Sequence, residues 1–146
     1  MIGADVTLDK KGNASEALIQ ADRAYRRDAA SKAFAFSQEV VPQDRGTLLQ
    51  SGFQPEFRGD SIVWGYTAPQ AAPMEYGTDP FYPPVEPLLE WSRRVTGDEG
   101  LGWYVARKKI PKEGIDAQPY LRPSAEIAEQ WLQSHDFSDY YEDTFK

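Results

Sequence analysis

The side chains that could carry out acid or base catalysis in this sequence are a single histidine and the carboxylates. His135 stands directly before Asp136, and Glu75 lies in the middle of the chain. A small hydrolase that uses His135 with Glu75 or Asp136 is one hypothesis. A Ser-His-Asp enzyme also needs a presented serine nucleophile, and no serine here is flanked by glycines as in such sites. We therefore expect a protein that is not an enzyme and has no catalytic residues.

Ligands for metals and cofactors are scarce in this sequence. The chain has no cysteine and one histidine, so disulfides are excluded and the common zinc and iron–sulfur sites lack their ligands. Gly100 and Gly102 stand without the rest of a dinucleotide fingerprint, and no Gly-Lys-Ser/Thr phosphate loop occurs. We expect neither a metal nor a cofactor.

The charge balance argues against tight binding of nucleic acid. The 146 residues include 16 Lys and Arg against 23 Asp and Glu, a formal net charge of -7. Affinity for DNA or RNA comes from cations that displace counterions along the phosphates, so weak or repulsive contact is expected. The basic pairs Arg93-Arg94 and Lys108-Lys109 could contact phosphates, but a solvated helix face is the favoured interpretation.

The apolar residues are not grouped as a membrane protein requires. No stretch approaches the roughly 20 apolar residues that span a bilayer, and the first residues lack the apolar core of a signal peptide. We expect a soluble protein without a membrane partner, used inside a cell or packed into a particle assembled there.

A long helix is expected near the start of the chain. Asn13 and Glu16 match a capping box, apolar residues then recur at three- and four-residue steps up to Val40, and Pro42 ends the pattern. The opposite face carries charged side chains that we expect to be solvated and paired with one another: Asp22, Arg23, Arg26, Arg27, Asp28 and Lys32.

A β-hairpin is expected next, after a short helical turn at 47–50. Apolar residues alternate in 53–58 and again in 62–66, and Gly59-Asp60 between them is typical of a two-residue type II′ turn. A lone hairpin is too small to be stable. We therefore expect it to pack on the first and last helices, with or without a further strand.

Proline and glycine separate shorter helices in the rest of the chain. A short helix closed by Gly77 is followed by a helix from Pro87 to Val95 that packs through Leu88, Leu89, Trp91 and Val95. A third helix is expected roughly from Leu101 to Ile110, ended by Pro111 and Gly114, and a final helix is expected to begin near Pro123. The predicted fold class is α+β, with long N-terminal and C-terminal helices on a small antiparallel sheet and two short helices.

The end of the chain has a composition of its own. Residues 135–146 combine four acids and Lys146, a net charge of -3, with the aromatic residues Phe137, Tyr140, Tyr141 and Phe145. We predict a single domain over residues 1–134 and an acidic aromatic arm over 135–146 that contacts a partner subunit. A frayed terminus is the alternative.

Several motifs occur in one order along the chain. They read PQDRGTLLQSG from Pro42, MEYGT from Met74, PPVEPLLEW from Pro83, VARKKI from Val105 with Gly114-Ile115, and QPYLRPS from Gln118. In this order they resemble a family of small tailed-phage proteins of the head–tail junction, described as neck, head–tail joining, tail-completion or minor tail proteins. The resemblance covers roughly residues 14 to 132. Pro73, just before MEYGT, and Ser124, where alanine is usual, depart from the family pattern.

The resemblance implies a structural virion protein, assembled in the host cytoplasm and located at the head–tail junction. It would form a homo-oligomeric ring, six- or twelve-fold, around the DNA channel and join the head connector to tail proteins. DNA would pass without tight binding. A tail terminator or tube-capping protein is the alternative within the same particle.

The same resemblance singles out two motifs as subunit contacts or as scaffold of the monomer. They are Glu75-Tyr76-Gly77-Thr78 and Pro119-Tyr120-Leu121-Arg122-Pro123. Arg122, held between two prolines, is placed to pair with a carboxylate such as Glu75.

Overall fold

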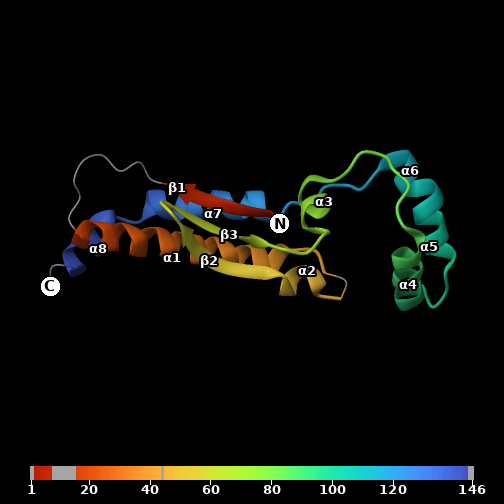
Figure 1. Ribbon diagram of the computed structural model, residues 1–146, viewed down its shortest axis with the longest axis horizontal. Helices are drawn as coiled ribbons and strands as arrows, with labels where there is room; N and C mark the ends of the chain where they lie inside the picture. The colour runs from red at the N-terminus through yellow and green to blue at the C-terminus, as the bar shows by residue number, and fades with distance from the viewer. Residues whose placement is uncertain (1, 8–15, 44, 145–146) are drawn as a thin grey trace. The chain divides into compact units, whose positions relative to one another are not determined.

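The structure, a computed structural model, describes residues 2–7, 16–43 and 45–144. It confirms the α+β fold class, with long helices near both ends and a small antiparallel sheet (Figure 1). The chain divides into unit 1, Met1–Ala71 with Pro119–Lys146, and unit 2, Ala72–Gln118. Asn13, the expected helix cap, and Phe145 of the expected arm lie outside the described residues.

The sheet of unit 1 contains the expected hairpin. Its strands are antiparallel in the order β1-β3-β2, and a short helix, α2, precedes β2. Gly59 in the turn has a φ of 64°, the positive value that the first position of a type II′ turn requires. The hairpin prediction is confirmed, and β1 adds a third strand. The bounds are Ile2–Thr7 (β1), Thr47–Gln50 (α2), Gly52–Arg58 (β2) and Ser61–Tyr66 (β3).

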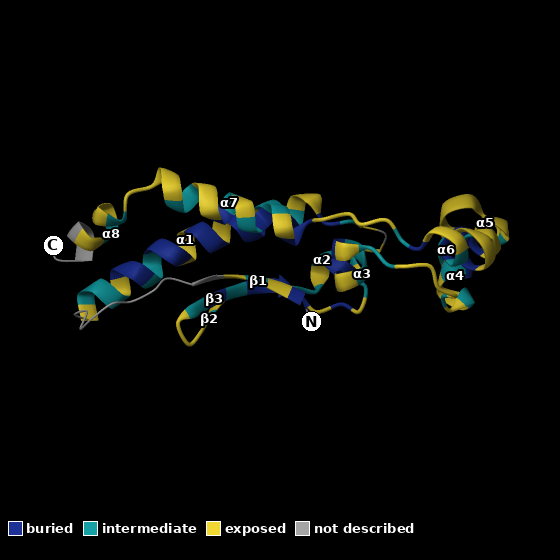
Figure 2. Cartoon of the chain, turned by 90° about the horizontal axis from the view of Figure 1, so that it is seen from above, coloured by how far each residue is buried: buried dark blue, intermediate teal, exposed yellow. Residues whose placement is uncertain are grey.

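Two long helices, Glu16–Val40 (α1) and Leu121–Ser134 (α7), lie against one face of this sheet. Figure 2 shows the two helices on one side of the strands, with buried residues gathered between the layers. Alternate residues of β3 are fully buried in this core: Ile62, Trp64 and Tyr66. The period-two alternation of an antiparallel strand with one covered face thus holds for β3.

Hydrogen bonds between buried polar groups join the two layers. The indole N–H of Trp64 donates to Ser124 Oγ in α7 over 3.1 Å. The hydroxyl of Tyr66 lies 2.8 Å from Ser37 Oγ and accepts a hydrogen bond from Gln38 Nε2 over 2.6 Å. Burial raises the pKa of Tyr66, although these two bonds oppose the shift. Ser124 accepts the hydrogen bond of the buried Trp64 indole, and alanine at this position would leave that N–H without an acceptor.

Part of the charged face of α1 is buried, and the prediction of a solvated face was wrong there. Arg26 has no exposed surface, and its Nη2 donates to Asp22 Oδ2 over 2.9 Å. Its Nη1 donates to the backbone carbonyl of Asp60 in the hairpin turn, and its Cζ lies 5.1 Å from the centre of the Phe57 ring. The hairpin packs over this side of α1, a long-range contact that helical periodicity does not reveal.

The C-terminal segment packs on α1 within unit 1. Phe137–Thr144 forms helix α8, and the rings of Phe137 and Tyr140 each lie 5.5 Å from the ring of Tyr25 in α1. The observed division therefore differs from the expected one, a domain over 1–134 followed by an arm. The reason is that Phe137 and Tyr140 of the segment pack on Tyr25 of α1.

Unit 2 is mostly helical. Its main elements are α4 and a continuous helical segment of α5, η1 and α6, which we call helix 100–113. Gly97, with a φ of 85°, ends α4 as the sequence predicts. The bounds are Val85–Thr96 (α4), Gly100–Tyr104 (α5), Val105–Lys109 (η1) and Ile110–Glu113 (α6).

Two expectations for unit 2 are contradicted. Helix 100–113 continues past Pro111 to Glu113 and ends at Gly114, the second of the two expected stops; within it the Ile110 amide donates to the Val105 carbonyl five residues back in a π-helical bond. Pro111 then lies in the first turn of α6, where a missing N–H costs least. Val95, expected on the packing side of α4, is 59% exposed.

Candidate interaction surface

Gly77 and Thr78 join the first and last parts of unit 2. Gly77 follows the short helix Ala71–Tyr76 (α3) with a φ of 71°, and a Cβ there would lie 2.7 Å from the Ile115 carbonyl oxygen. The Thr78 amide donates to that oxygen over 2.9 Å, and the Ile115 amide donates to Thr78 Oγ1 over 3.0 Å. Only glycine satisfies both the conformation and the close approach. In this geometry the two residues shape the monomer.

Three residues of the second motif lie in the packing of unit 1. The Tyr120 hydroxyl donates to the Ala71 carbonyl over 2.8 Å, and its ring meets that of Tyr66 edge to face at 5.0 Å. Leu121 is 3% exposed at the start of α7, and Pro123 lies in the first turn of that helix. Their contacts fix the entry of the chain into α7.

The remaining motif residues are split between the surface and the interior. Tyr76 is 59% exposed, and Pro119 and Arg122 are exposed. Glu75 has no exposed surface. Glu75 belongs to unit 2 and Arg122 to unit 1, so their pairing stays a prediction, as does the role of these residues in subunit contact.

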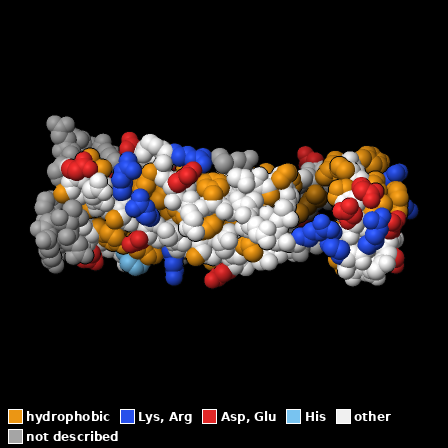
Figure 3. Space-filling model, turned by 60° about the horizontal axis from the view of Figure 1, so that its bottom comes forward, with side chains coloured by type: hydrophobic (Ala, Val, Ile, Leu, Met, Phe, Trp, Pro, Cys, Tyr) orange, Lys and Arg blue, Asp and Glu red, His pale blue; other side chains and the backbone are white. Residues whose placement is uncertain are grey.

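Large apolar side chains are exposed mainly on unit 2. Among the described residues, seven of the nine exposed large hydrophobic side chains lie in its 47 residues. Figure 3 shows hydrophobic side chains at the surface of this unit, beside charged ones. Exposed apolar area of this kind marks interaction sites in proteins. The seven are Tyr76, Phe81, Tyr82, Val95, Leu101, Trp103 and Tyr104.

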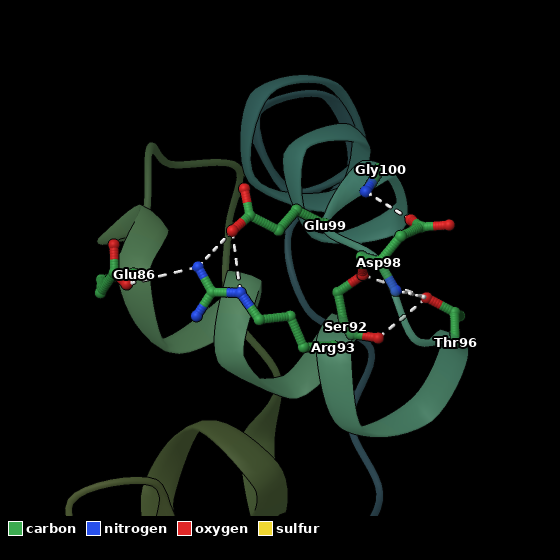
Figure 4. Close-up of polar contacts among 7 residues, drawn as sticks. All are labelled: Glu86, Ser92, Arg93, Thr96, Asp98, Glu99 and Gly100. Carbon is green, nitrogen blue, oxygen red and sulfur yellow. Dashed lines mark hydrogen bonds and ion pairs between the residues drawn. The ribbon is translucent and has the colours of Figure 1, made fainter.

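A hydrogen-bonded turn between α4 and α5 orients helix 100–113 (Figure 4). Ser92 Oγ donates to the Asp98 carbonyl over 2.7 Å, and the Gly100 amide donates to the Asp98 carboxylate over 2.8 Å. Arg93 Nε donates to Glu99 Oε1 over 2.8 Å, and this bond raises the pKa of Arg93. These hydrogen bonds tie the turn to the end of α4 and to the start of α5.

One row of helix 100–113 is buried within unit 2. Gly102, Ala106 and Ile110 recur every four residues, and each is buried. A Cβ on Gly102 would lie 2.6 Å from the carbonyl oxygen of Leu88 in α4, so glycine lets the two helices approach closely. This row sets which side of the helix faces outward.

The opposite row of the same helix is basic and aromatic. Tyr104, Lys108 and Lys112 follow the buried row by two residues, which turn a helix by roughly 200°, and all three are exposed. Beside them the Arg107 guanidinium lies 5.3 Å from the centre of the exposed Trp103 ring, a cation–π contact. We call the exposed side of helix 100–113, with these five residues, the basic face.

On unit 1, α8 has an inner aromatic side. The Tyr25 hydroxyl lies 2.5 Å from the Leu132 carbonyl and 3.0 Å from the His135 carbonyl, both near the end of α7. The Tyr140 hydroxyl donates to Asp28 Oδ2 in α1. Burial, and then the hydrogen bond to Asp28, raise the pKa of Tyr140 to about 12. These contacts hold α8 on α1.

The outer side of α8 carries an acid, and the segment 136–143 around it contains no basic residue. Asp139 is exposed and Tyr141 is 37% exposed. Asp136 precedes the helix, and its Oδ1 accepts a hydrogen bond from the Ser138 amide over 2.9 Å. The Ser138 amide and hydroxyl hold the pKa of the Asp136 carboxyl below its usual value. Of the residues predicted to contact partners, Phe137 and Tyr140 thus face α1, and Tyr141 is at the surface.

The residues of the hydrolase hypothesis have local structural partners. The His135 ring stacks on Trp131 with ring centres 4.0 Å apart, and its Nδ1 lies 2.9 Å from the Trp131 carbonyl. His135 and Asp136 belong to unit 1, whereas Glu75 belongs to unit 2.

In residues 2–7, 16–43 and 45–144, no group of three or more His, Asp or Glu could hold a metal ion. In the same residues, no helix is long and apolar enough to cross a membrane.

Comparison with known proteins adds no relative: no family model, curated protein or solved structure matches the chain.

The sequence alone does not identify the basic face as a site. It predicts only a solvated pair at Lys108-Lys109 and gives Trp103 and Tyr104 no distinct role. The signal that it does contain is four basic residues within 107–112, three residues after an aromatic pair at 103–104. Knowing which of them face outward requires the contact of Gly102 with Leu88, which is a tertiary feature.

Proposed function

We propose that this chain is a structural protein of the head–tail junction of a tailed virus, where copies form a ring around the DNA channel. The order of the motifs along the chain supports this assignment. The observation that carries it in the structure is the set of exposed aromatic and aliphatic side chains on unit 2. A building block whose function is to contact other subunits needs such a surface.

The two units suit different tasks in such a ring. Unit 1 has a core of α1, α7 and the sheet, tied by buried polar contacts such as Trp64 with Ser124. Unit 2 is small, and a core of that size leaves much apolar surface uncovered. Unit 1 would act as the body of the subunit, and unit 2 would contact neighbouring copies, the connector or tail proteins.

The charge of the chain fits a channel through which DNA moves. The net charge of -7 disfavours lasting contact with phosphates. A ring of such subunits would let DNA pass without holding it.

The proposal is tested on purified virus particles. Mass spectrometry of the particles should detect the chain, and cryo-electron microscopy should place its density between the head connector and the tail. Density at the far end of the tail tube would instead identify a terminator or capping protein. A chain absent from purified particles would refute the assignment to a virion.

A further inference from the structure

We propose that the basic face of helix 100–113 binds the acidic outer side of α8 from a second copy of this chain. The inference rests on the proposed function, because it specifies how neighbouring subunits of the ring would contact one another. It assigns complementary roles to two surfaces, one on each unit.

The basic face has the composition of a protein-binding surface. Helix 100–113 contains four basic residues and one acidic residue, and its basic residues are all exposed. Trp103 is 42% exposed and Tyr104 is 53% exposed, so aromatic area lies next to the charges. Aromatic residues and arginine are the residue types most enriched at interface hot spots.

The outer side of α8 complements this face in charge and in residue type. Residues 136–143 include four carboxylates and no basic residue. Asp139 and Tyr141 are exposed, whereas Phe137 and Tyr140 are engaged with Tyr25. The inner contacts hold α8 on unit 1, which leaves its acidic outer side available for a neighbour. Opposite charges on two surfaces speed their encounter and fix their register.

Nucleic acid is the competing occupant of the basic face, and the observations favour protein. Unit 2 as a whole has six Lys and Arg against eight Asp and Glu, so its net charge is negative. Phosphate binding draws its affinity from the summed positive charge of a surface. A short basic row with adjacent aromatic rings inside an acidic unit fits a short acidic helix better than a long polyanion.

The geometry of assembly follows from the use of two different surfaces. Each copy has one basic face and one α8. When two copies associate, the first still presents its own α8 and the second still presents its own basic face, so each end of the pair can bind a further copy. Such a head-to-tail contact closes into a ring when the rotation between subunits allows it.

Charge reversal on each side provides the test. The basic-face variant is K108E/K112E, and the acidic-helix variant is D139K/E142K. Sedimentation velocity and native mass spectrometry of the full chain should show association of the wild type that weakens with salt. Each variant alone should associate at least about tenfold more weakly, since like charges then face one another. Asp136 is left unchanged because it caps the start of α8.

Mixing the variants separates a direct contact from a general loss of association. A mixture of the two offers two complementary pairs of surfaces, one with the native charges and one with both charges reversed, so it should associate although neither variant does so alone. The quadruple variant carries both reversals and should recover association. Matched controls on exposed residues of unit 1, K32E/R45E and E126K/E129K, make the same charge changes and should associate as the wild type does.

The outcomes against the inference are equally defined. A wild type that stays monomeric at all concentrations, or reversal variants that associate normally, would overturn it. So would a basic-face variant that loses binding to duplex DNA while its self-association is unchanged. The particle experiment is separate: a chain found at the head–tail junction whose reversal variants still assemble would refute this contact and keep the proposed function.

Discussion

Arg26 and Asp22 form an ion pair inside unit 1, with Nη2 of Arg26 2.9 Å from Oδ2 of Asp22 and no exposed surface on Arg26. Both residues lie on α1, one helical turn apart. Arg26 also donates to the Asp60 carbonyl, so it links the long helix to the hairpin turn. A buried guanidinium is tolerated only while its charge is compensated.

Replacement of Asp22 by alanine is expected to be strongly destabilising. The change leaves the charge of Arg26 buried without its carboxylate, and breaking such a pair costs about 3–5 kcal/mol. The free energy of unfolding from urea titration measures the loss. The matched control is Glu56→Ala, which breaks the exposed pair of Glu56 with Arg58 and should cost less than about 1 kcal/mol. Equal losses in the two variants would show that burial of Arg26 does not matter.

Replacement of Gly77 by alanine is expected to loosen unit 2. Alanine at a positive φ costs roughly 1–2 kcal/mol, and its Cβ would also lie 2.7 Å from the Ile115 carbonyl oxygen. Gly97→Ala is the matched control, because Gly97 has a φ of 85° but a Cβ added there would meet nothing within 4 Å. Hydrogen exchange of the Ile115 amide, which donates to Thr78, should accelerate far more in the Gly77 variant. Similar exchange in both variants would contradict the close packing at Gly77.

The features that the sequence predicts correctly are those that a few neighbouring residues determine. Gly59-Asp60 sets the hairpin turn, and Gly97 ends α4, because each requires a backbone conformation that glycine adopts easily. The fold class follows from such signals together with the apolar periods of the helices and strands.

The features that the sequence does not predict depend on residues far apart in the chain or on unusual local bonding. Helical periodicity locates the apolar stripe of α1 but not the hairpin that covers its other side, so it wrongly predicts a solvated Arg26. A proline normally ends a helix, and nothing in the residues around Pro111 reveals the π-helical bond from Ile110 to Val105. The basic face likewise depends on the approach of Gly102 to Leu88.

The raised pKa of Tyr140, about 12, predicts a loss of stability at alkaline pH. Below pH 10 the hydroxyl is protonated in the folded and the unfolded chain, so its stabilising contribution is complete. As the pH rises from 10 towards 12, the unfolded chain loses this proton first and the free energy of unfolding falls. Tyr140→Phe should make this fall smaller, as measured by urea titrations across that range. Burial also raises the pKa of Tyr25 and Tyr66, so part of the fall should remain.

Asp28→Asn provides a second measurement of the same contact. It keeps an acceptor near the Tyr140 hydroxyl but removes the negative charge, so the pKa of Tyr140 should drop while staying above its usual value because of burial. Titration of tyrosinate absorbance should show one tyrosine ionising at lower pH than in the wild type. An unchanged titration curve would mean that Tyr140 does not bond to Asp28 in solution.

Trp103→Ser is expected to weaken self-association while leaving the fold intact. Trp103 is 42% exposed and contacts Arg107, so its loss should change the free energy of unfolding by only about 1 kcal/mol. If Trp103 contacts a neighbouring subunit, its removal should weaken association about tenfold or more, as at interface hot spots. Val40→Ser is the matched control, because Val40 has the same exposed fraction but lies on unit 1, at the end of α1. Sedimentation velocity over a range of concentrations distinguishes the two, and equal effects would show that exposed apolar area anywhere on the chain, not the basic face, drives association.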